Sequence, residues 1–312
     1  MDEPGGKDGR LGDELVHVRH HTSIVPTVLL AEVGLEILNL QLGGLHGVVP
    51  SSDEPTGLSA TEPEGATPLT DPAPWIEDRW PTDPAKVRSI VLVLHGGQAR
   101  SPTTVRRRPQ LGYLRMVPFA RFLHRHDGEH GMSVRILRYR YRGWDEPTLH
   151  PVQDARWALT QLRDQHPDTS IALLGHSMGG RVALRVADHP AVRAVCALAP
   201  WTLDDEPVRQ LSGRSVLIAH GDRERRTDPQ LSYLLAVRAK QVTSRVCRFD
   251  VLGDGHAMLR RAHDWSELAA RFVAAELGLR NPDPLIEDAM HRPAPEGLRV
   301  PLPTMTQARW WR

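Results

Sequence analysis

The fold is decided by residues 170–186, which read SIALLGHSMGGRVALRV. The first five residues form a short apolar run of the kind found in buried strands. The motif G-x-S-x-G follows directly, and an apolar pattern with helical spacing comes after it. Glycines at positions 175 and 179 remove Cβ clashes, so a strained turn can hold the hydroxyl of Ser177 exposed at the end of the strand. This order of strand, turn and helix predicts that Ser177 is a nucleophile.

The same alternation of strands and helices continues on both sides of this stretch, from about Val87 to Arg280. Short, continuous apolar runs are typical of strands that are covered on both faces of a sheet. The runs that predict strands are Ser89–Leu94, Ser133–Tyr139, Ser170–Leu174, Val192–Leu198, Ser215–Ala219 and Arg245–Val251. Helical periods separate them, which predicts an α/β fold with a mostly parallel twisted sheet and helices on both faces. In such folds, ligands bind at the carboxyl ends of the strands.

His256 is the candidate base that would activate Ser177. It follows the last predicted strand, and the glycines at 253 and 255 can let it reach back toward the serine. The nearest competitor, His263, follows two arginines in what reads as an exposed helix. We therefore expect the base at His256.

A carboxylate must accept a hydrogen bond from this imidazole and fix its tautomer. The segment after the run at Ser215–Ala219 offers three carboxylates, namely Asp222, Glu224 and Asp228. All three precede His256, so the chain order is serine, acid, histidine, and any of the three can serve if the loop sets the reach.

Residues from about Val87 to Leu279 resemble an α/β-hydrolase-fold serine hydrolase of the carboxylesterase or dienelactone-hydrolase kind. The resemblance rests on the G-x-S-x-G motif in its strand and helix context and on the order of the three candidate residues. It implies that the acid lies at Glu224, where aspartate is the commoner residue, with Asp222 as the alternative.

The resemblance also implies an oxyanion hole in the segment Leu94 to Gln98, after the first predicted strand. One N–H group would come from Met178 and one from Gly97, with Gln98 as the alternative to Gly97. His95 is expected to be structural. The connection between Leu198 and Ser215 has room for one helix only, so we expect no substantial lid.

Aromatic residues after two predicted strands are candidates for lining a substrate pocket. Trp144 and Trp201 are the main candidates, although aromatic residues at strand ends are as often part of the core. Arg106, Arg107 and Arg108 can attract an acidic substrate, but a solvated run of charge is the favoured interpretation.

These residues together favour an enzyme that cleaves a carboxylic ester, or a thioester or lactone, through an acyl-Ser177 intermediate. An acyltransferase with the same catalytic residues is one alternative. A non-catalytic, hydrolase-like binding module is the other, but it would be expected to lack the serine, the histidine or the oxyanion glycines.

Composition limits the partners. The formal net charge is +1, which disfavours a dedicated nucleic-acid binder, and no apolar stretch is long enough to span a membrane. Cys196 and Cys247 lie in different predicted strands, so a reducing, cytoplasmic location is expected. No cofactor or metal is expected, and the partner should be a small-molecule acyl substrate. Nothing in the sequence predicts the oligomeric state.

The two ends of the chain have a different character from the middle. We expect residues 1–86 to be a largely irregular extension, with a possible amphipathic helix at 26–42, because prolines recur from Pro50 to Pro84. Residues 281–312 carry six prolines and are expected to form a second extension, which leaves residues 87–280 as the catalytic domain.

Overall fold

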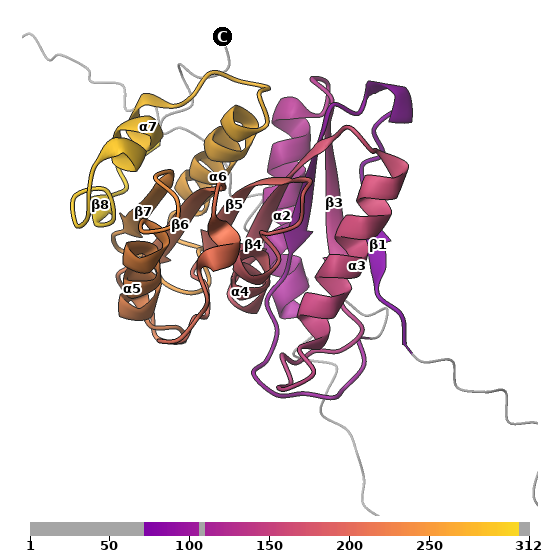
Figure 1. Ribbon diagram of the computed structural model, residues 1–312, viewed down its shortest axis with the longest axis horizontal. Helices are drawn as coiled ribbons and strands as arrows, with labels where there is room; N and C mark the ends of the chain where they lie inside the picture. Colours follow the sequence, from indigo (N-terminus) through magenta and orange to yellow (C-terminus); the bar gives the residue numbers. More distant parts are fainter. Residues whose placement is uncertain (1–71, 106–109, 306–312) are drawn as a thin grey trace, which may run out of the picture. The chain divides into compact units, whose positions relative to one another are not determined.

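One sheet organises the part of the chain that the computed structural model describes, which comprises residues 72–105 and 110–305 (Figure 1). The expected helix at 26–42 and the basic run Arg106–Arg108 lie outside these residues. The described residues all belong to one compact unit. The strands are β1 (Trp75–Glu77), β2 (Ser89–Leu94), β3 (Met132–Arg138), β4 (Ser170–His176), β5 (Val192–Leu198), β6 (Ser215–Gly221), β7 (Val246–Val251) and β8 (Val300–Pro301).

The strand order is β1-β3-β2-β4-β5-β6-β7-β8, in which only β1 is antiparallel to its neighbour. Each of the six predicted strands is present, and β2 and β5 have the predicted bounds. The sheet is therefore mostly parallel, as the alternating pattern predicted.

Helices connect the strands and cover both faces of the sheet (Figure 1). The helices are α2 (Leu111–Asp127), α3 (His150–Gln165), α4 (Met178–Arg185), α5 (Pro229–Ala239), α6 (Ala262–Glu276) and α7 (Pro284–His291), with short 3-10 turns η1 (Pro84–Lys86) and η2 (Arg209–Leu211). Within the described ranges, no helix has the length and apolar character needed to cross a membrane.

Two hydrophobic cores lie on opposite faces of the sheet. Side chains alternate between the faces of a strand, so Val91 and Val93 of β2 pack with α2, α6 and α7, whereas Ile90 and Leu92 pack with α3, α4 and α5. All four side chains are fully buried. This explains why the strand sequences are continuously apolar instead of alternating.

Two strands of the sheet lie outside the limits of 87–280 that we expected for the catalytic domain. β1 pairs with β3, and β8 pairs with β7 through Phe249 and Val300. Helix α7, capped by the Asp283 side chain, buries Ile286 and Met290 against the core. Thus the described part of the expected C-terminal extension adds a helix and an edge strand. Strands of two or three residues are too short to show a period of two, and prolines are tolerated at a sheet edge.

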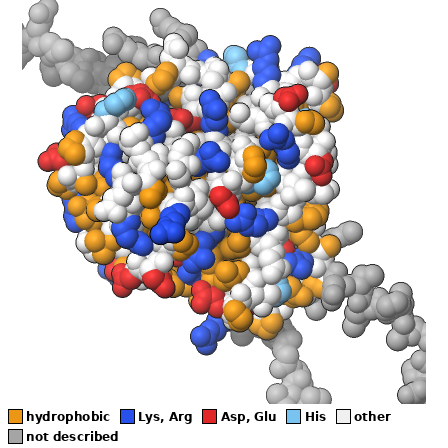
Figure 2. Space-filling model, in the orientation of Figure 1, with side chains coloured by type: hydrophobic (Ala, Val, Ile, Leu, Met, Phe, Trp, Pro, Cys, Tyr) orange, Lys and Arg blue, Asp and Glu red, His pale blue; other side chains and the backbone are white. Residues whose placement is uncertain are grey.

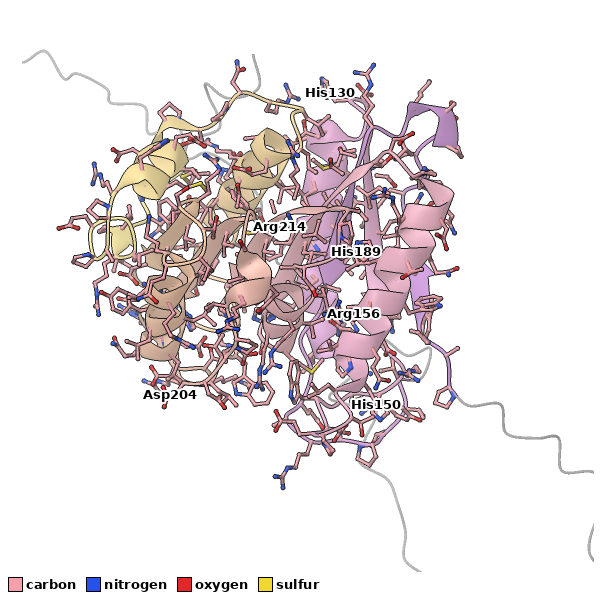
Figure 3. All side chains as sticks on the ribbon, in the orientation of Figure 1. His130, His150, Arg156, His189, Asp204 and Arg214 are labelled. Atoms are coloured by element: carbon pink, nitrogen blue, oxygen red, sulfur yellow. The ribbon has the colours of Figure 1, made fainter. Side chains whose placement is uncertain are left out.

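The parallel strands place their carboxyl ends at one edge of the sheet. Figure 3 shows His150 and Asp204, which follow β3 and β5, at the lower edge of the view, and His130, which precedes β3, at the upper edge. The loops after β2, β4, β6 and β7, where the candidate site residues lie, therefore meet at a common edge.

Candidate active site

The turn at Ser177 has the strained geometry that the motif predicted. Ser177 follows the last residue of β4 and precedes the first residue of α4, with φ of 55° and ψ of −119°. This region of backbone space is sparsely populated by residues with a side chain. A Cβ at Gly175 would collide with the backbone of Gly179, and a Cβ at Gly179 would collide with the carbonyl of Leu94. Glycine is needed at both positions so that the backbones of β4, the start of α4 and the end of β2 can pack together.

Backbone hydrogen bonds hold the turn against the neighbouring strand. The N–H of Ser177 donates to the carbonyl of Leu198 over 3.0 Å, and its own carbonyl accepts from the N–H of Trp201 over 3.1 Å. The N–H of Arg181 also donates to this carbonyl, over 3.2 Å. These bonds use the main chain of Ser177 and leave its half-buried side chain for other contacts.

The glycines after β2 lie against this turn. A Cβ at Gly96 would be 3.4 Å from the Cβ of Ser177, and a Cβ at Gly97 would be 2.5 Å from the terminal methyl of Met178. Met178 is the first residue of α4, whose first N–H groups have no partner within the helix. The N–H of Gly97 donates to no acceptor among the residues that the structure describes. The main chain of Gly96 and Gly97 therefore packs closely against Ser177 and Met178.

The alternative donor, Gln98, is occupied. Its N–H donates to the carbonyl of Arg142 over 2.9 Å, in a bridge that ties the loop after β2 to the loop after β3. This corrects the expectation that Gln98 can replace Gly97. His95 is buried, with Nδ1 2.8 Å from the carbonyl oxygen of Gly96, and burial lowers the pKa of its imidazole to about 4. It is a neutral, structural residue at neutral pH.

His256 and Glu224 form a hydrogen bond between the loops after β7 and β6. The Nδ1 of His256 donates to Oε2 of Glu224 over 2.8 Å. The other carboxylate oxygen of Glu224 accepts from the N–H groups of Arg225 and Arg226, over 2.7 and 2.6 Å. The Glu224 side chain is fully buried, whereas that of His256 is 17% exposed.

The carboxylate of Glu224 stays ionised in spite of its burial. Burial alone would raise its pKa, but the hydrogen bond from His256 and those from the backbone of Arg226 and Arg225 outweigh burial and lower the pKa to about 2. An ionised carboxylate on Nδ1 keeps the proton there and leaves Nε2 of the neutral ring as the acceptor.

The other two candidate acids, Asp222 and Asp228, contact other parts of the chain. Asp222 is exposed and accepts from the N–H of Gly253 over 2.6 Å, so it braces the loop before His256 without touching the imidazole. Asp228 caps the start of α5 by accepting from the N–H of Gln230. Of the three alternatives, Glu224 is the one that the structure brings to His256.

His176, which the sequence analysis did not single out, joins the loop of His256 to the turn at Ser177. Its Nε2 lies 3.0 Å from the carbonyl oxygen of His256, and the two rings are 4.7 Å apart between centroids. A carbonyl can only accept, so Nε2 carries the proton. Burial, together with the nearby charge of His256, lowers the pKa of His176 to about 3, so the ring is neutral. Its position next to Ser177 in the motif was the available signal.

His220, which the sequence analysis also did not single out as a site residue, packs against the loop that carries Glu224. His220, the sixth residue of β6, is buried between the hydroxyls of Ser232, 2.9 Å away, and Thr227, 3.1 Å away. Its Nε2 is 3.9 Å from Oε2 of Glu224. Burial, followed by the nearby charge of Arg248, lowers the pKa of His220 to about 3. A neutral ring therefore fills the space beneath Glu224.

The two tryptophans pack on a buried arginine. The guanidinium of Arg181 lies 4.1 Å from the ring centroid of Trp144 and 4.7 Å from that of Trp201. Trp144 is 1% exposed, and its indole N–H donates to Glu146 over 3.0 Å. The expectation that Trp144 lines a substrate pocket is thus wrong, because its ring is part of the core. Trp201 is half-buried, and its main chain contacts Ser177.

Arg181 itself forms a buried ion pair behind the turn. Its Nε donates to Glu206 over 2.6 Å, and both side chains are almost completely buried. Arg185 contacts the second oxygen of the same carboxylate. Cation–π contacts and this pair fix α4, and with it the position of Ser177 at the start of that helix.

Solved structures with the same fold include hydrolases. An acetyl ester-xyloside bifunctional hydrolase from Caldicellulosiruptor lactoaceticus matches with a TM-score of 0.52 and 16% identity, over 68% of this chain and 92% of that chain. The butyrate-bound thermophilic esterase Est2 from Thermogutta terrifontis matches with a TM-score of 0.50 and 18% identity, over 67% of this chain and 91% of that chain. At these identities the likeness shows the fold. Among curated protein sequences, none matches this chain.

A family model gives the more specific finding. The model described as serine aminopeptidase, S33, matches residues 85–248, which is more than half of the chain. This range includes β2, the turn at Ser177 and Glu224, and it ends before His256. The chain therefore belongs to the serine aminopeptidase S33 family and is a serine hydrolase of the α/β-hydrolase fold.

Proposed function

We propose that this enzyme hydrolyses a carboxylic ester through an acyl-Ser177 intermediate, with His256 as base and Glu224 as the acid that orients it. The observation that carries the proposal is the hydrogen bond from His256 to the ionised Glu224, in a loop whose main chain is linked through His176 to the strained turn at Ser177. Ser177, Glu224 and His256 also follow one another along the chain in the order of nucleophile, acid and base that is typical of the fold.

In the first half of the reaction, Ser177 Oγ attacks the ester carbonyl carbon while His256 Nε2 takes the hydroxyl proton. The carbonyl oxygen becomes an oxyanion that the N–H groups of Gly97 and Met178 can meet. The bond from carbon to the leaving oxygen then breaks, and the proton on His256 passes to that oxygen, which leaves as an alcohol. The acyl group remains on Ser177.

In the second half, water attacks the acyl carbon and His256 takes one of its protons. The tetrahedral intermediate collapses, the bond to Ser177 Oγ breaks, and the proton returns to the serine. Glu224 keeps its negative charge throughout and stabilises the imidazolium that forms at each step.

The proposal favours short acyl groups and water as the acceptor. Between β5 and β6 the described chain contains only η2, a single turn, so no helical lid is inserted in this connection. An uncovered acyl-enzyme is open to water, which favours hydrolysis over transfer to another acceptor. A short acyl chain also agrees with two structural neighbours, the acetyl ester-xyloside bifunctional hydrolase and the esterase with bound butyrate.

Labelling with a fluorophosphonate probe tests the proposal. We expect the wild-type chain to be labelled at Ser177 and the Ser177→Ala variant to remain unlabelled. The matched control is Ser212→Ala, which removes an exposed serine that has no place in the site and should leave labelling unchanged. If the wild type is not labelled, the chain is a binding module and the proposal fails.

Turnover assays then define the substrate class. Acetyl and butyryl p-nitrophenyl esters should be hydrolysed faster than an aminoacyl p-nitroanilide, which tests the amide cleavage suggested by the name of the family. Faster turnover of the anilide would contradict an ester substrate. A rise in ester turnover on adding an alcohol, with formation of the new ester, would instead indicate an acyltransferase.

A further inference from the structure

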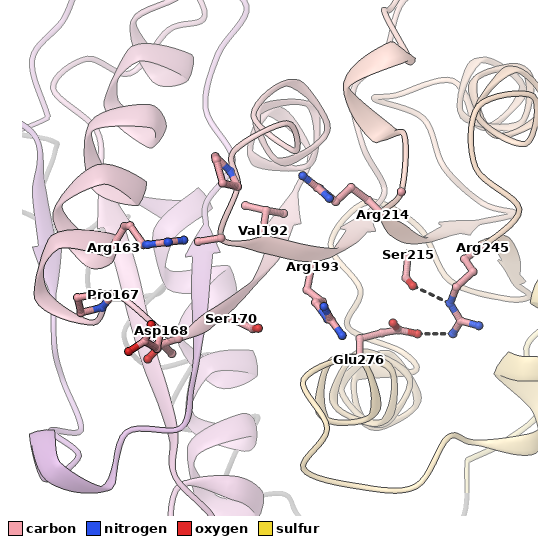
Figure 4. Close-up of a pocket in the computed structure, with 14 residues that line it drawn as sticks. Arg163, Pro167, Asp168, Ser170, Val192, Arg193, Arg214, Ser215, Arg245 and Glu276 are labelled. Carbon is pink, nitrogen blue, oxygen red and sulfur yellow. Dashed lines mark hydrogen bonds and ion pairs between the residues drawn. The ribbon is translucent and has the colours of Figure 1, made fainter.

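A hollow lies at the end of the sheet opposite to Ser177 (Figure 4). Its volume is about 530 Å³, and its floor includes Ser170, Val192 and Ser215, the first residues of β4, β5 and β6. β4 runs for seven residues from this hollow to the turn at Ser177, which is about 20 Å at the usual rise of a strand. The hollow is thus separate from the candidate active site.

Four arginines from different elements line the hollow. They are Arg163 of α3, Arg193 of β5, Arg214 before β6 and Arg245 before β7. Figure 4 shows Arg163 and Arg214 extending toward each other on either side of Val192, whereas Arg193 extends away from Val192 toward Glu276. Guanidinium groups that approach from separate elements can surround one anion from several sides.

Only part of this positive charge is neutralised by the protein. Arg245 donates to Glu276 over 2.6 Å and to Glu287 over 2.7 Å, and Nε of Arg214 donates to the carbonyl of Ala187. In contrast, the guanidinium groups of Arg163 and Arg193 have no hydrogen bond or ion pair with any residue in 72–105 or 110–305. Two guanidinium groups are therefore free to bind a ligand.

A bulge presents Arg193 to the hollow. Ile171 of β4 pairs with Val192, but the next residue, Ala172, pairs with Ala194, so Arg193 is an extra residue in β5. It is the one exposed position of a strand that is otherwise buried. Bulges re-aim side chains and are frequent beside binding sites.

The carboxylates in the lining do not cancel the arginines. Asp168 and Glu276 are the acidic residues of the lining, and Glu276 is already paired with Arg245. The pKa of His189, which precedes Pro190 of the lining, is lowered by its burial and then by the positive charges of Arg163 and Arg156. Basic side chains are also spread across much of the face shown in Figure 2.

We propose that this hollow, which we call the arginine pocket, binds a small molecule that carries a phosphate group. A carboxylate has two oxygens and is satisfied by a single guanidinium fork, whereas the terminal oxygens of a phosphate can accept from forks that approach from several directions. Arg163, Arg193 and Arg214, which line the arginine pocket from three separate elements, fit the second geometry. The hydroxyl of Ser170, which has no hydrogen bond to another described residue, adds a neutral donor.

Calorimetric titration of the full chain with pyrophosphate, at low ionic strength, tests the arginine pocket. We expect the wild type to bind, and the double variant Arg163→Ala/Arg193→Ala to bind about tenfold more weakly or worse. Asp168→Asn should bind a few-fold more tightly, because it removes the unpaired carboxylate of the lining. Citrate, a carboxylate anion of comparable charge, should bind more weakly than pyrophosphate.

The matched control is Arg125→Ala/Arg209→Ala, which also removes two exposed arginines but lies outside the arginine pocket. It should bind pyrophosphate like the wild type. Fluorophosphonate labelling of both double variants should match the wild type, which verifies folding and separates this test from that of the proposed function. The proposal is overturned if the wild type does not bind pyrophosphate at about 1 mM, a weak affinity of about −4 kcal/mol. Equal weakening in the two double variants, or preference for citrate, would also overturn it.

Discussion

The two ends of the sheet hold their charged residues in opposite ways. At the carboxyl end, the side chains of Glu224, Arg181 and Glu206 are buried, and each has a charged or titratable partner within hydrogen-bond distance. At the amino end, Arg163 and Arg193 are exposed and have no partner among the described residues. Charged side chains that are held in place by partners suit catalysis, which requires a fixed geometry. Unpaired guanidinium groups suit the binding of an anionic ligand, which supplies the negative charge that the protein does not.

The largest expected effect is on catalysis at the carboxyl end. Glu224→Gln should lower kcat/KM for a short p-nitrophenyl ester by about 10³–10⁴-fold, because the amide no longer holds the proton on Nδ1 of His256. Asp222→Asn is the matched control and should lower it by less than about tenfold, since Asp222 contacts only the loop backbone. Comparable losses in the two variants would mean that Glu224 is not the orienting acid.

The sequence predicted those parts of the fold that have strong local patterns. β2 and β5 are continuous apolar runs, and their bounds were predicted without error. β1 and β8, with three and two residues, are defined by the neighbour with which each pairs and have no periodicity of their own. Local sequence can predict buried strands, but it cannot predict short edge strands, because pairing partners are distant in the chain.

The candidate site also contains residues that local sequence can predict and residues that it cannot. Ser177 and His256 could be proposed because each follows a strand and is flanked by glycines. For His176 the position next to Ser177 was the one local signal, and its role could not be predicted because its partner is a carbonyl 80 residues away. The Arg181–Glu206 pair could not be predicted either, since the two residues are 25 positions apart. The prediction for Trp144 was wrong for a related reason. The sequence pattern of an aromatic residue after a strand is the same whether its ring lines a pocket or packs on a buried cation.

The next largest expected effect is on the free energy of unfolding, and it differs between the carboxyl end and the amino end of the sheet. Glu206→Gln should lower the free energy of unfolding by about 3–5 kcal/mol, because it leaves the buried guanidinium of Arg181 without its main partner. Arg193→Gln also removes one charge, but from the exposed amino end, and should change stability by less than about 0.5 kcal/mol. Urea unfolding of both variants checks the contrast. A similar loss in each would show that burial does not distinguish the two ends.

The smallest effect is the pH dependence that the buried acid contributes. The pKa of Glu224 is about 2 in the folded chain, against an ordinary value of 4.5. A lowered carboxyl pKa stabilises the fold fully above the ordinary value, and that stabilisation is lost as the pH falls toward the folded value. The difference in unfolding free energy between the wild type and Glu224→Gln should therefore be about 1 kcal/mol smaller at about pH 3.5 than at about pH 5.5.

Taking this difference between two proteins removes the titration of all other carboxylates, which both chains share. Asp222→Asn supplies the comparison with an exposed carboxylate of the same region, for which the corresponding difference should stay constant with pH to within about 0.5 kcal/mol. If the Glu224→Gln difference is equally constant, the hydrogen bonds from His256 and the loop backbone do not hold the carboxylate in its ionised form. The contrast between the fixed charges of the carboxyl end and the free charges of the amino end would then rest on the Arg181–Glu206 pair alone.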